Sequence, residues 1–183
     1  MKIRDQESVS LINFDVKKYT IENFDIEKIN TQILSEDLNR RILDRTDVKY
    51  QDKLLPNTKE IEELKKFLTT IVSNQCNKKM KCDEIWTIVL EKNESVSYHS
   101  HKKHFVDNQN DFYSIALYTK VPENSADLIF FVTAFNAFDY CVKISPKEGM
   151  LLVFNSAIPH MSTAHISEEK RIVISANFSP ENN

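Results

Sequence analysis

Three histidines in this sequence have the spacing of metal ligands. His99 and His101 are separated by a single serine. In an extended segment, residues i and i+2 point to the same side, so both imidazoles can approach one metal ion. His160 is the leading candidate for a third ligand, because it comes at a turn after the apolar run 149–154. The alternative interpretation of residues 99–104 is a polar turn rich in histidine and lysine.

An arginine begins the last apolar segment of the chain. If residues 171–178 form a strand, Arg171, Val173, Ser175 and Asn177 share one face and the other face is apolar. A guanidinium group can bind a carboxylate through two parallel hydrogen bonds. With serine and asparagine on the same face, Arg171 predicts a pocket for an anion; the alternative is a surface arginine at the edge of a sheet.

The composition argues against several functional classes. The chain has 183 residues, of which 41% are hydrophobic, enough for one sizeable core. Its 24 basic and 27 acidic residues give a net charge of −3, which predicts no basic surface for nucleic acid or anionic membranes. Gly149 is the only glycine, so glycine-rich phosphate-binding loops are not expected.

The sequence also bears on the compartment. Its 3 cysteines form no Cys-x-x-Cys pair and leave one over, which favours free thiols in a reducing compartment. No stretch approaches the roughly 18 consecutive apolar residues that would span a bilayer. We therefore expect a cytoplasmic protein without a membrane segment.

The first part of the chain predicts strands followed by two helices. Residues 8–24 favour one or two short strands. Asp25 can cap a helix that runs to about Leu43, and a loop is expected over 44–57. A second helix is expected to start at Asn57 or Thr58. Its single apolar stripe predicts a packing surface and consists of Ile61, Leu64, Leu68, Ile71 and Val72.

From residue 84 onward, short runs of β-branched and aromatic residues alternate with polar turns. Strands are predicted near 85–91, 95–101, 112–119, 128–133, 140–144, 150–154 and 171–178. Their number and spacing fit a sandwich or a barrel. The expected fold class is therefore α+β but mainly β. We expect one domain over 1–183, in which residues 1–83 pack on a core formed by 84–179.

Residues 86–178, half of the chain, resemble the superfamily of 2-oxoglutarate- and Fe(II)-dependent oxygenases, in particular its small members with a His-x-His motif. The order and spacing of several features carry this resemblance. They are Trp86, His99-Ser100-His101, the strand 114–118, Pro122 with 128–130, Gly149 with Phe154, His160 and Arg171. The resemblance implies a double-stranded β-helix, or jelly-roll, with the N-terminal helices outside one sheet. It also implies Fe(II) as cofactor, 2-oxoglutarate as co-substrate and hydroxylation of a C–H bond.

The same resemblance implies roles for individual residues. His99 and His160 would be iron ligands. Arg171 would pair with the distal carboxylate of 2-oxoglutarate, and Tyr118 and Ser175 would complete the co-substrate site.

The third ligand departs from the pattern of the superfamily. Most members carry Asp or Glu two residues after the first histidine, where this chain has His101. Either His101 is itself the third ligand, which we favour, or Asp107 or water fills the position. Glycines that often flank the second strand and the turn after it are also replaced, by residues 115–116 and 125–126.

Two other functional classes fit parts of the sequence. A three-histidine cupin-type metal dioxygenase has a similar ligand set, although the glutamate and glycines of the usual cupin motifs are missing here. The second class is a non-catalytic jelly-roll that serves as a binding or structural module. The expected partner is a small-molecule or peptide substrate, and an N-terminal edge strand could pair in a homodimer.

Overall fold

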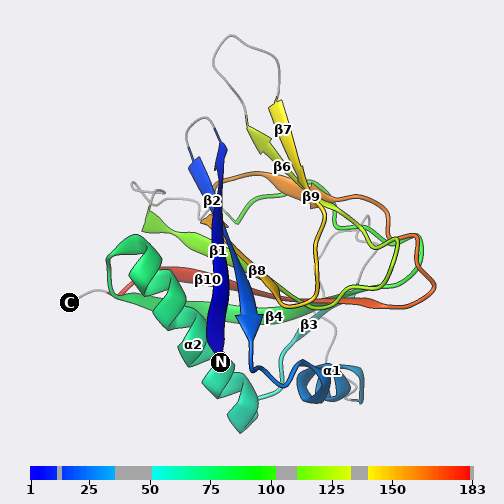
Figure 1. The fold of residues 1–183 in the computed structure, drawn as a ribbon, viewed down its shortest axis with the longest axis horizontal. Coiled ribbons are helices and arrows are strands. Elements are labelled where there is room, and N and C mark those ends of the chain that lie inside the picture. Colours follow the sequence, from blue (N-terminus) through cyan, green and yellow to red (C-terminus); the bar gives the residue numbers. More distant parts are fainter. Residues whose placement is uncertain (12–13, 36–50, 102–110, 133–139, 182–183) are drawn as a thin grey trace.

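The structure is a computed structural model that describes residues 1–11, 14–35, 51–101, 111–132 and 140–181 (Figure 1). Its elements follow the order β1 (Lys2–Leu11), β2 (Phe14–Glu22), α1 (Ile26–Ser35), β3 (Gln51–Leu54), α2 (Lys59–Cys76), β4 (Met80–Leu90), β5 (Tyr113–Lys120), β6 (Leu128–Val132), β7 (Tyr140–Ile144), β8 (Met150–Asn155), β9 (His160–Ser162) and β10 (Arg171–Pro180).

The described strands form two antiparallel sheets. The larger sheet has the order β1-β2-β8-β5-β10-β4-β3, and the smaller one has the order β7-β6-β9. The smaller sheet packs over one face of the larger sheet through a shared apolar cluster, and the helices cover the opposite face (Figure 1). This arrangement is a double-stranded β-helix with helices on its outside, as the resemblance implied.

The alternation of side chains along β10 explains how one strand serves both sides of the large sheet. Ile172 and Ile174 are buried in the cluster that contains the helices. Arg171 and Ser175 point the other way, into the space between the two sheets. The predicted period of two along this strand is therefore confirmed.

Both helices begin directly after a capping residue that the sequence predicts. The backbone N–H of Lys28 donates to Asp25 Oδ1 at 3.0 Å, and that of Ile61 donates to Thr58 Oγ1 at 3.3 Å. The apolar stripe of α2 is buried against the large sheet, as expected. Of the helices that the structure describes, none is both long and apolar enough to cross a membrane. The predicted continuation of α1 to Leu43 lies outside the described residues.

Two short strands were not predicted. The prediction of a loop over 44–57 is wrong at Gln51–Leu54. These residues form β3, at the edge of the large sheet beside β4. The prediction failed because four mostly polar residues show no apolar alternation. The strand β9, at His160–Ser162, has only three residues and was expected to be a turn.

The prediction of a regular strand over 95–101 is also wrong. The segment pairs with β9 only at interrupted positions, including an isolated bridge between His99 and His160, and the chain bends at Tyr98. Val96 is 5% exposed whereas Tyr98 is 57% exposed, so these two do not share a face as alternation predicted. The broken ladder lets the chain turn between the two residues.

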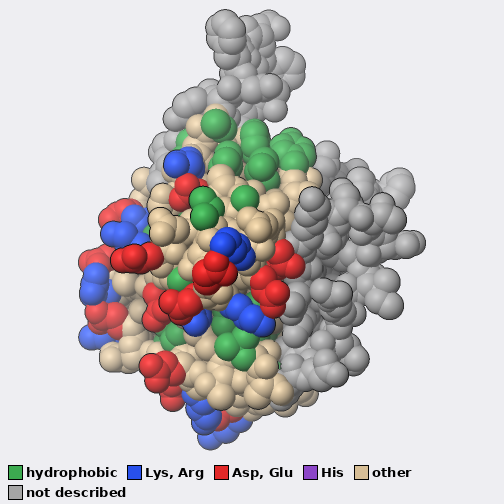
Figure 2. Space-filling model, turned by 90° about the vertical axis from the view of Figure 1, so that its right-hand side faces the viewer, with side chains coloured by type: hydrophobic (Ala, Val, Ile, Leu, Met, Phe, Trp, Pro, Cys, Tyr) green, Lys and Arg blue, Asp and Glu red, His purple; other side chains and the backbone are tan. Residues whose placement is uncertain are grey.

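On the face seen in Figure 2, acidic and basic side chains lie intermixed. Ion pairs join neighbouring elements, for example Lys120 with Glu169 at 3.1 Å and Lys170 with Glu91 at 2.9 Å. Such mixing gives no continuous positive surface on the described part of this face.

Gly149 occupies a position that other residues fit poorly. Its φ is +77°, and a Cβ added there would lie 3.1 Å from the carbonyl oxygen of Ile21. Its N–H donates to Tyr118 O and its carbonyl accepts from Ile21 N, both at 2.9 Å. The residue therefore ties the start of β8 to both β2 and β5.

Replacing Gly149 with alanine should lower the free energy of unfolding by about 1–3 kcal/mol, because a Cβ strains the left-handed backbone and crowds Ile21. Urea unfolding followed by circular dichroism measures this change. The exposed neighbour provides the control, since Glu148→Ala should shift stability by no more than about 0.5 kcal/mol. Unchanged stability of Gly149→Ala would contradict the assigned strain.

Candidate active site

A backbone bridge brings His99 and His160 together. The N–H of His99 donates to His160 O at 3.0 Å, and the N–H of His160 donates to His99 O at 2.8 Å. Directly opposed residues of an antiparallel pair project their side chains to the same side. The two ring centroids consequently lie 4.3 Å apart.

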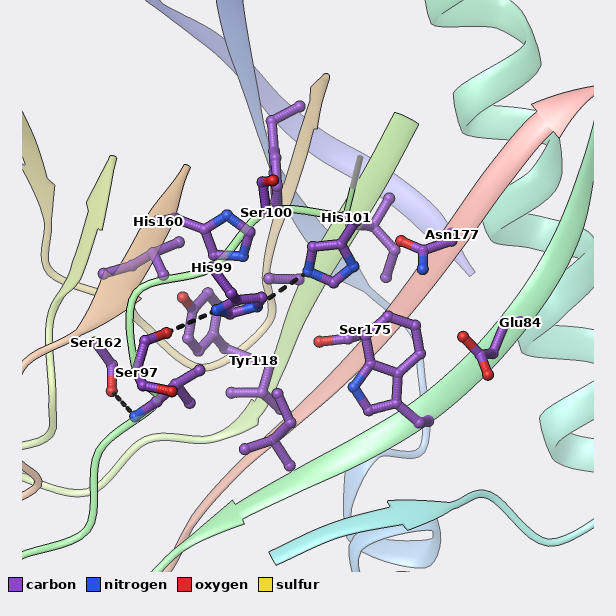
Figure 3. A pocket seen from close by; sticks show the side chains of 18 of the residues that line it. Glu84, Ser97, His99, Ser100, His101, Tyr118, His160, Ser162, Ser175 and Asn177 are labelled. Atoms are coloured by element: carbon purple, nitrogen blue, oxygen red, sulfur yellow. Dashed lines mark hydrogen bonds between the residues drawn. The ribbon is translucent and has the colours of Figure 1, made fainter. Parts of the chain in front are cut away.

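His101 completes a cluster of three imidazoles. Its N–H donates to Ser156 O at 2.9 Å, and its ring stacks on Trp86 at 5.4 Å between centroids with 23° between planes. One ring nitrogen from each of the three histidines lies within 4.8 Å of the others (Figure 3). The structure thus brings together the three histidines that the sequence singled out.

Hydrogen bonds determine which nitrogens of the cluster can act as ligands. His99 Nδ1 is 2.7 Å from Ser97 O, and His160 Nδ1 is 3.0 Å from Ile158 O. Because a carbonyl oxygen only accepts, each Nδ1 carries the proton and each Nε2 keeps its lone pair. His99 Nε2 lies 3.2 Å from His101 Nε2, a separation at which the two nitrogens can share one proton or one metal ion. This donor set fits a divalent transition metal.

The surroundings of His160 favour its neutral form. The side chain is buried, and the rings of Phe130 and Phe154 pack against it. Burial lowers the pKa of His160 well below its usual value, and positive charge on His99 or His101 lowers this pKa further. A neutral imidazole is the form that binds a metal.

Arg171 is a buried cation at the start of β10. Its side chain is 3% exposed, and within the described parts of the chain no carboxylate lies within ion-pair distance of it. One nitrogen donates to Ala126 O at 2.9 Å, and the guanidinium carbon lies 5.2 Å from the centre of the Tyr118 ring. Nε is buried without a hydrogen-bond partner among the described residues. This arrangement suits a carboxylate ligand, which would satisfy both charge and hydrogen bonding.

Tyr118 and Ser175 belong to the same site as Arg171 and the histidines. Both residues are buried and line the same cavity. Burial raises the pKa of Tyr118, so its hydroxyl stays protonated and can donate a hydrogen bond. The hydroxyl of Ser175 points into the cavity (Figure 3).

These residues line one pocket between the two sheets, which we call the central pocket. Its volume is about 240 Å³, and its walls combine the polar groups above with apolar residues such as Ile88, Leu128 and Phe154. Every site residue predicted from the sequence that the structure describes borders this pocket. Asp107, the alternative third ligand, lies outside the described residues.

Sequence reasoning missed several residues that shape the pocket. Glu84 lines it two positions before Trp86 on β4, a spacing that could have placed both on one face. Ser162 is buried at 1% exposure, and its hydroxyl accepts the N–H of Val96 at 2.8 Å. The N–H of Ser162 donates to Val96 O at 3.0 Å, so this serine holds the segment that leads to His99.

The family comparison agrees with this site. A family model described as "Putative 2OG-Fe(II) oxygenase" matches residues 84–177, about half of the chain. The chain therefore belongs to this family of 2-oxoglutarate- and Fe(II)-dependent oxygenases, whose cofactor and co-substrate are Fe(II) and 2-oxoglutarate. This membership favours the oxygenase prediction over the cupin-type dioxygenase and the non-catalytic module. No curated protein sequence matches the chain well enough to count as a relative.

Solved structures share the fold at low sequence identity. The non-heme α-ketoglutarate-dependent carbocyclase SnoK from nogalamycin biosynthesis matches with a TM-score of 0.71 and 9% identity, over 90% of this chain and 79% of SnoK. A viral collagen prolyl hydroxylase from Paramecium bursaria Chlorella virus 1, in complex with 2-oxoglutarate, matches with a TM-score of 0.62 and 14% identity, over 91% of this chain and 96% of that chain. These likenesses confirm the predicted double-stranded β-helix.

Replacing Ser162 with alanine should cost about 1–3 kcal/mol of unfolding free energy, because the buried N–H of Val96 loses its acceptor. Thermal or urea unfolding measures the loss. Ser167→Ala is the matched control: Ser167 also accepts a backbone N–H, from Glu169, but in an exposed position where water can replace it. Equal stabilities of the two variants would show that the hydrogen bond of Ser162 does not hold this segment.

Proposed function

We propose that His99, His101 and His160 together hold the iron of this oxygenase, and that the enzyme hydroxylates a C–H bond of a small-molecule or peptide substrate. The convergence of three imidazole nitrogens within 4.8 Å carries the proposal. Two of these nitrogens are oriented by hydrogen bonds from the opposite side of the ring, which is how proteins usually fix metal-binding histidines.

In this proposal the buried cation receives the co-substrate. Arg171 binds the distal carboxylate of 2-oxoglutarate, and Tyr118 and Ser175 donate hydrogen bonds within the same part of the pocket. Among the described residues Nε of Arg171 has no hydrogen-bond partner, which supports this role, because burying a guanidinium group without an anion is costly. Burial lowers the pKa of Arg171, but a guanidinium group is so strongly basic that Arg171 is still cationic at neutral pH.

When bound, iron(II) supplies the redox chemistry that couples decarboxylation of 2-oxoglutarate to succinate with transfer of one oxygen atom of O2 to the substrate. The chain's own residues supply position and environment. Trp86 and Ser156 hold His101 in place, and Phe130 and Phe154 shield His160 from water. A shielded pocket limits side reactions of a reactive oxidant.

The names and bound ligands of structural neighbours include both proposed kinds of substrate. One is named for prolyl hydroxylation of collagen, and HygX from Streptomyces hygroscopicus was solved with nickel, 2-oxoglutarate and hygromycin B bound. The free thiols of Cys76, Cys82 and Cys141 support the further proposal of a cytoplasmic location, where reduced cysteines persist.

Single substitutions should distinguish the histidines that bind iron from residues that do not. His160→Ala and His101→Ala should each weaken Fe(II) affinity by at least about 100-fold, because each removes a direct ligand, whereas His101→Asp should retain iron by supplying a carboxylate. Anaerobic calorimetric titration with Fe(II) measures the affinities. Tyr98→Ser, an exposed change beside His99, is the control and should bind iron normally. Unchanged affinity in His101→Ala would exclude His101 from the ligand set.

Removing the buried cation should separate iron binding from co-substrate binding. The iron-loaded protein should develop a weak visible charge-transfer band when 2-oxoglutarate is added anaerobically. Arg171→Met should keep iron but weaken 2-oxoglutarate by about 10- to 100-fold, the worth of a charged hydrogen bond. Lys170→Met removes a neighbouring exposed cation and should leave the titration unchanged. Absence of any band in the folded wild-type protein would contradict the proposed function.

A further inference from the structure

Two of the three proposed ligands are held by one short turn. This segment, residues 156–159 between β8 and β9, is called the β8–β9 turn. The carbonyl oxygen of Ser156 accepts the N–H of His101 at 2.9 Å, and the carbonyl oxygen of Ile158 lies 3.0 Å from Nδ1 of His160. A shift of the turn would therefore move the backbone of one ligand and the ring of another.

Hydrogen bonds give the turn its shape and its position. Asn155, the last residue of β8, accepts the N–H of Ala157 with its Oδ1 at 2.8 Å, which shapes the turn locally. The backbone N–H of Ser156 donates to Phe112 O at 2.9 Å, and its hydroxyl lies 2.8 Å from the hydroxyl of Ser114 on β5. The position of the turn against the large sheet therefore depends on Ser156.

The hydroxyls of Ser114 and Ser156 form a chain with a fixed direction. Ser114 Oγ donates to Asn177 Oδ1 at 2.7 Å. Because a serine hydroxyl has a single hydrogen, Ser114 must accept from Ser156, which is therefore the donor of this pair. The chain runs from the β8–β9 turn through β5 to Asn177 on β10.

Both serines are buried behind the wall of the site. Ser114 is 0% exposed and Ser156 is 2% exposed, and neither is among the described residues that line the central pocket, whereas Asn177 is. The two hydroxyls therefore support the site without lining it. Removing either hydroxyl leaves the other without its partner in a buried position, which costs free energy unless the turn moves.

We propose that the hydroxyl chain of Ser156, Ser114 and Asn177 positions the metal ligands. It fixes the β8–β9 turn against the large sheet and so holds His101 and His160 at the spacing that one metal ion requires. This inference rests on the proposed function, because it assumes that these histidines bind the metal. It assigns a positioning role to residues that do not themselves act as ligands.

The test is an anaerobic titration of the purified protein with Co(II). This ion follows Fe(II) in the order of affinity for nitrogen ligands, and its visible bands respond to the arrangement of the ligands. Ser114→Ala and Ser156→Ala should each weaken Co(II) binding by about 10- to 100-fold, the usual cost of removing a group that orients a ligand, and should alter the bands. The double variant should lose no more than the weaker-binding single variant, because members of one chain act as a unit. Thermal unfolding shows whether each variant is folded, and either single variant suffices for the test.

Thr87→Val is the matched control. It also removes one buried hydroxyl, which donates to Val173 O at 3.0 Å, but on the face of the large sheet away from the pocket. This variant should be less stable than the wild type and should keep its Co(II) affinity and bands.

Wild-type affinity and bands in the folded serine variants would overturn the inference, because the hydroxyls would then stabilise the fold alone. Losses that multiply in the double variant would also overturn it, since the two hydroxyls would then act separately. Failure of the proposed function is distinct, because it appears as the absence of Co(II) binding by the wild-type protein.

Discussion

The paired hydrogen bonds between the backbones of His99 and His160 are the constraint on which the site depends. They join two segments that are far apart in the sequence, and they set two imidazoles on the same side with 4.3 Å between ring centres. His101 follows two residues later on the same segment, where a hydrogen bond to Ser156 O and stacking on Trp86 complete the cluster. The hydrogen bonds between Val96 and Ser162 extend this junction in one direction.

Local patterns predicted the parts of the fold that depend on local physics. The alternation in β10 fixed which residues face the pocket, because a period of two leaves no freedom once one face is buried. The caps at Asp25 and Thr58 were found because each accepts a backbone N–H of the first helical turn that has no partner within the helix, which is a local interaction. The segment 95–101 was misjudged because its partner is the three-residue β9, and strand pairing between distant segments leaves no mark on either sequence. Glu84 was missed because the predicted strand began at residue 85, whereas β4 already begins at Met80.

The ligand set gives the site an unusual charge for its superfamily. A histidine stands where most members have a carboxylate, so the three proposed ligands are neutral and leave the full charge of the metal ion in place. Together with Arg171, this makes the pocket attractive to an anion such as 2-oxoglutarate.

Anomalous X-ray diffraction from anaerobic crystals soaked with Fe(II) tests the central claim most directly, because it locates the metal and its ligands together. A single anomalous peak within bonding distance of Nε2 of His99, His101 and His160 is the predicted result. A peak bonded to His99 and His160 while His101 turns away, with a carboxylate or water in its place, would contradict the three-histidine centre. The absence of a peak between these residues would contradict the assignment of the metal site itself.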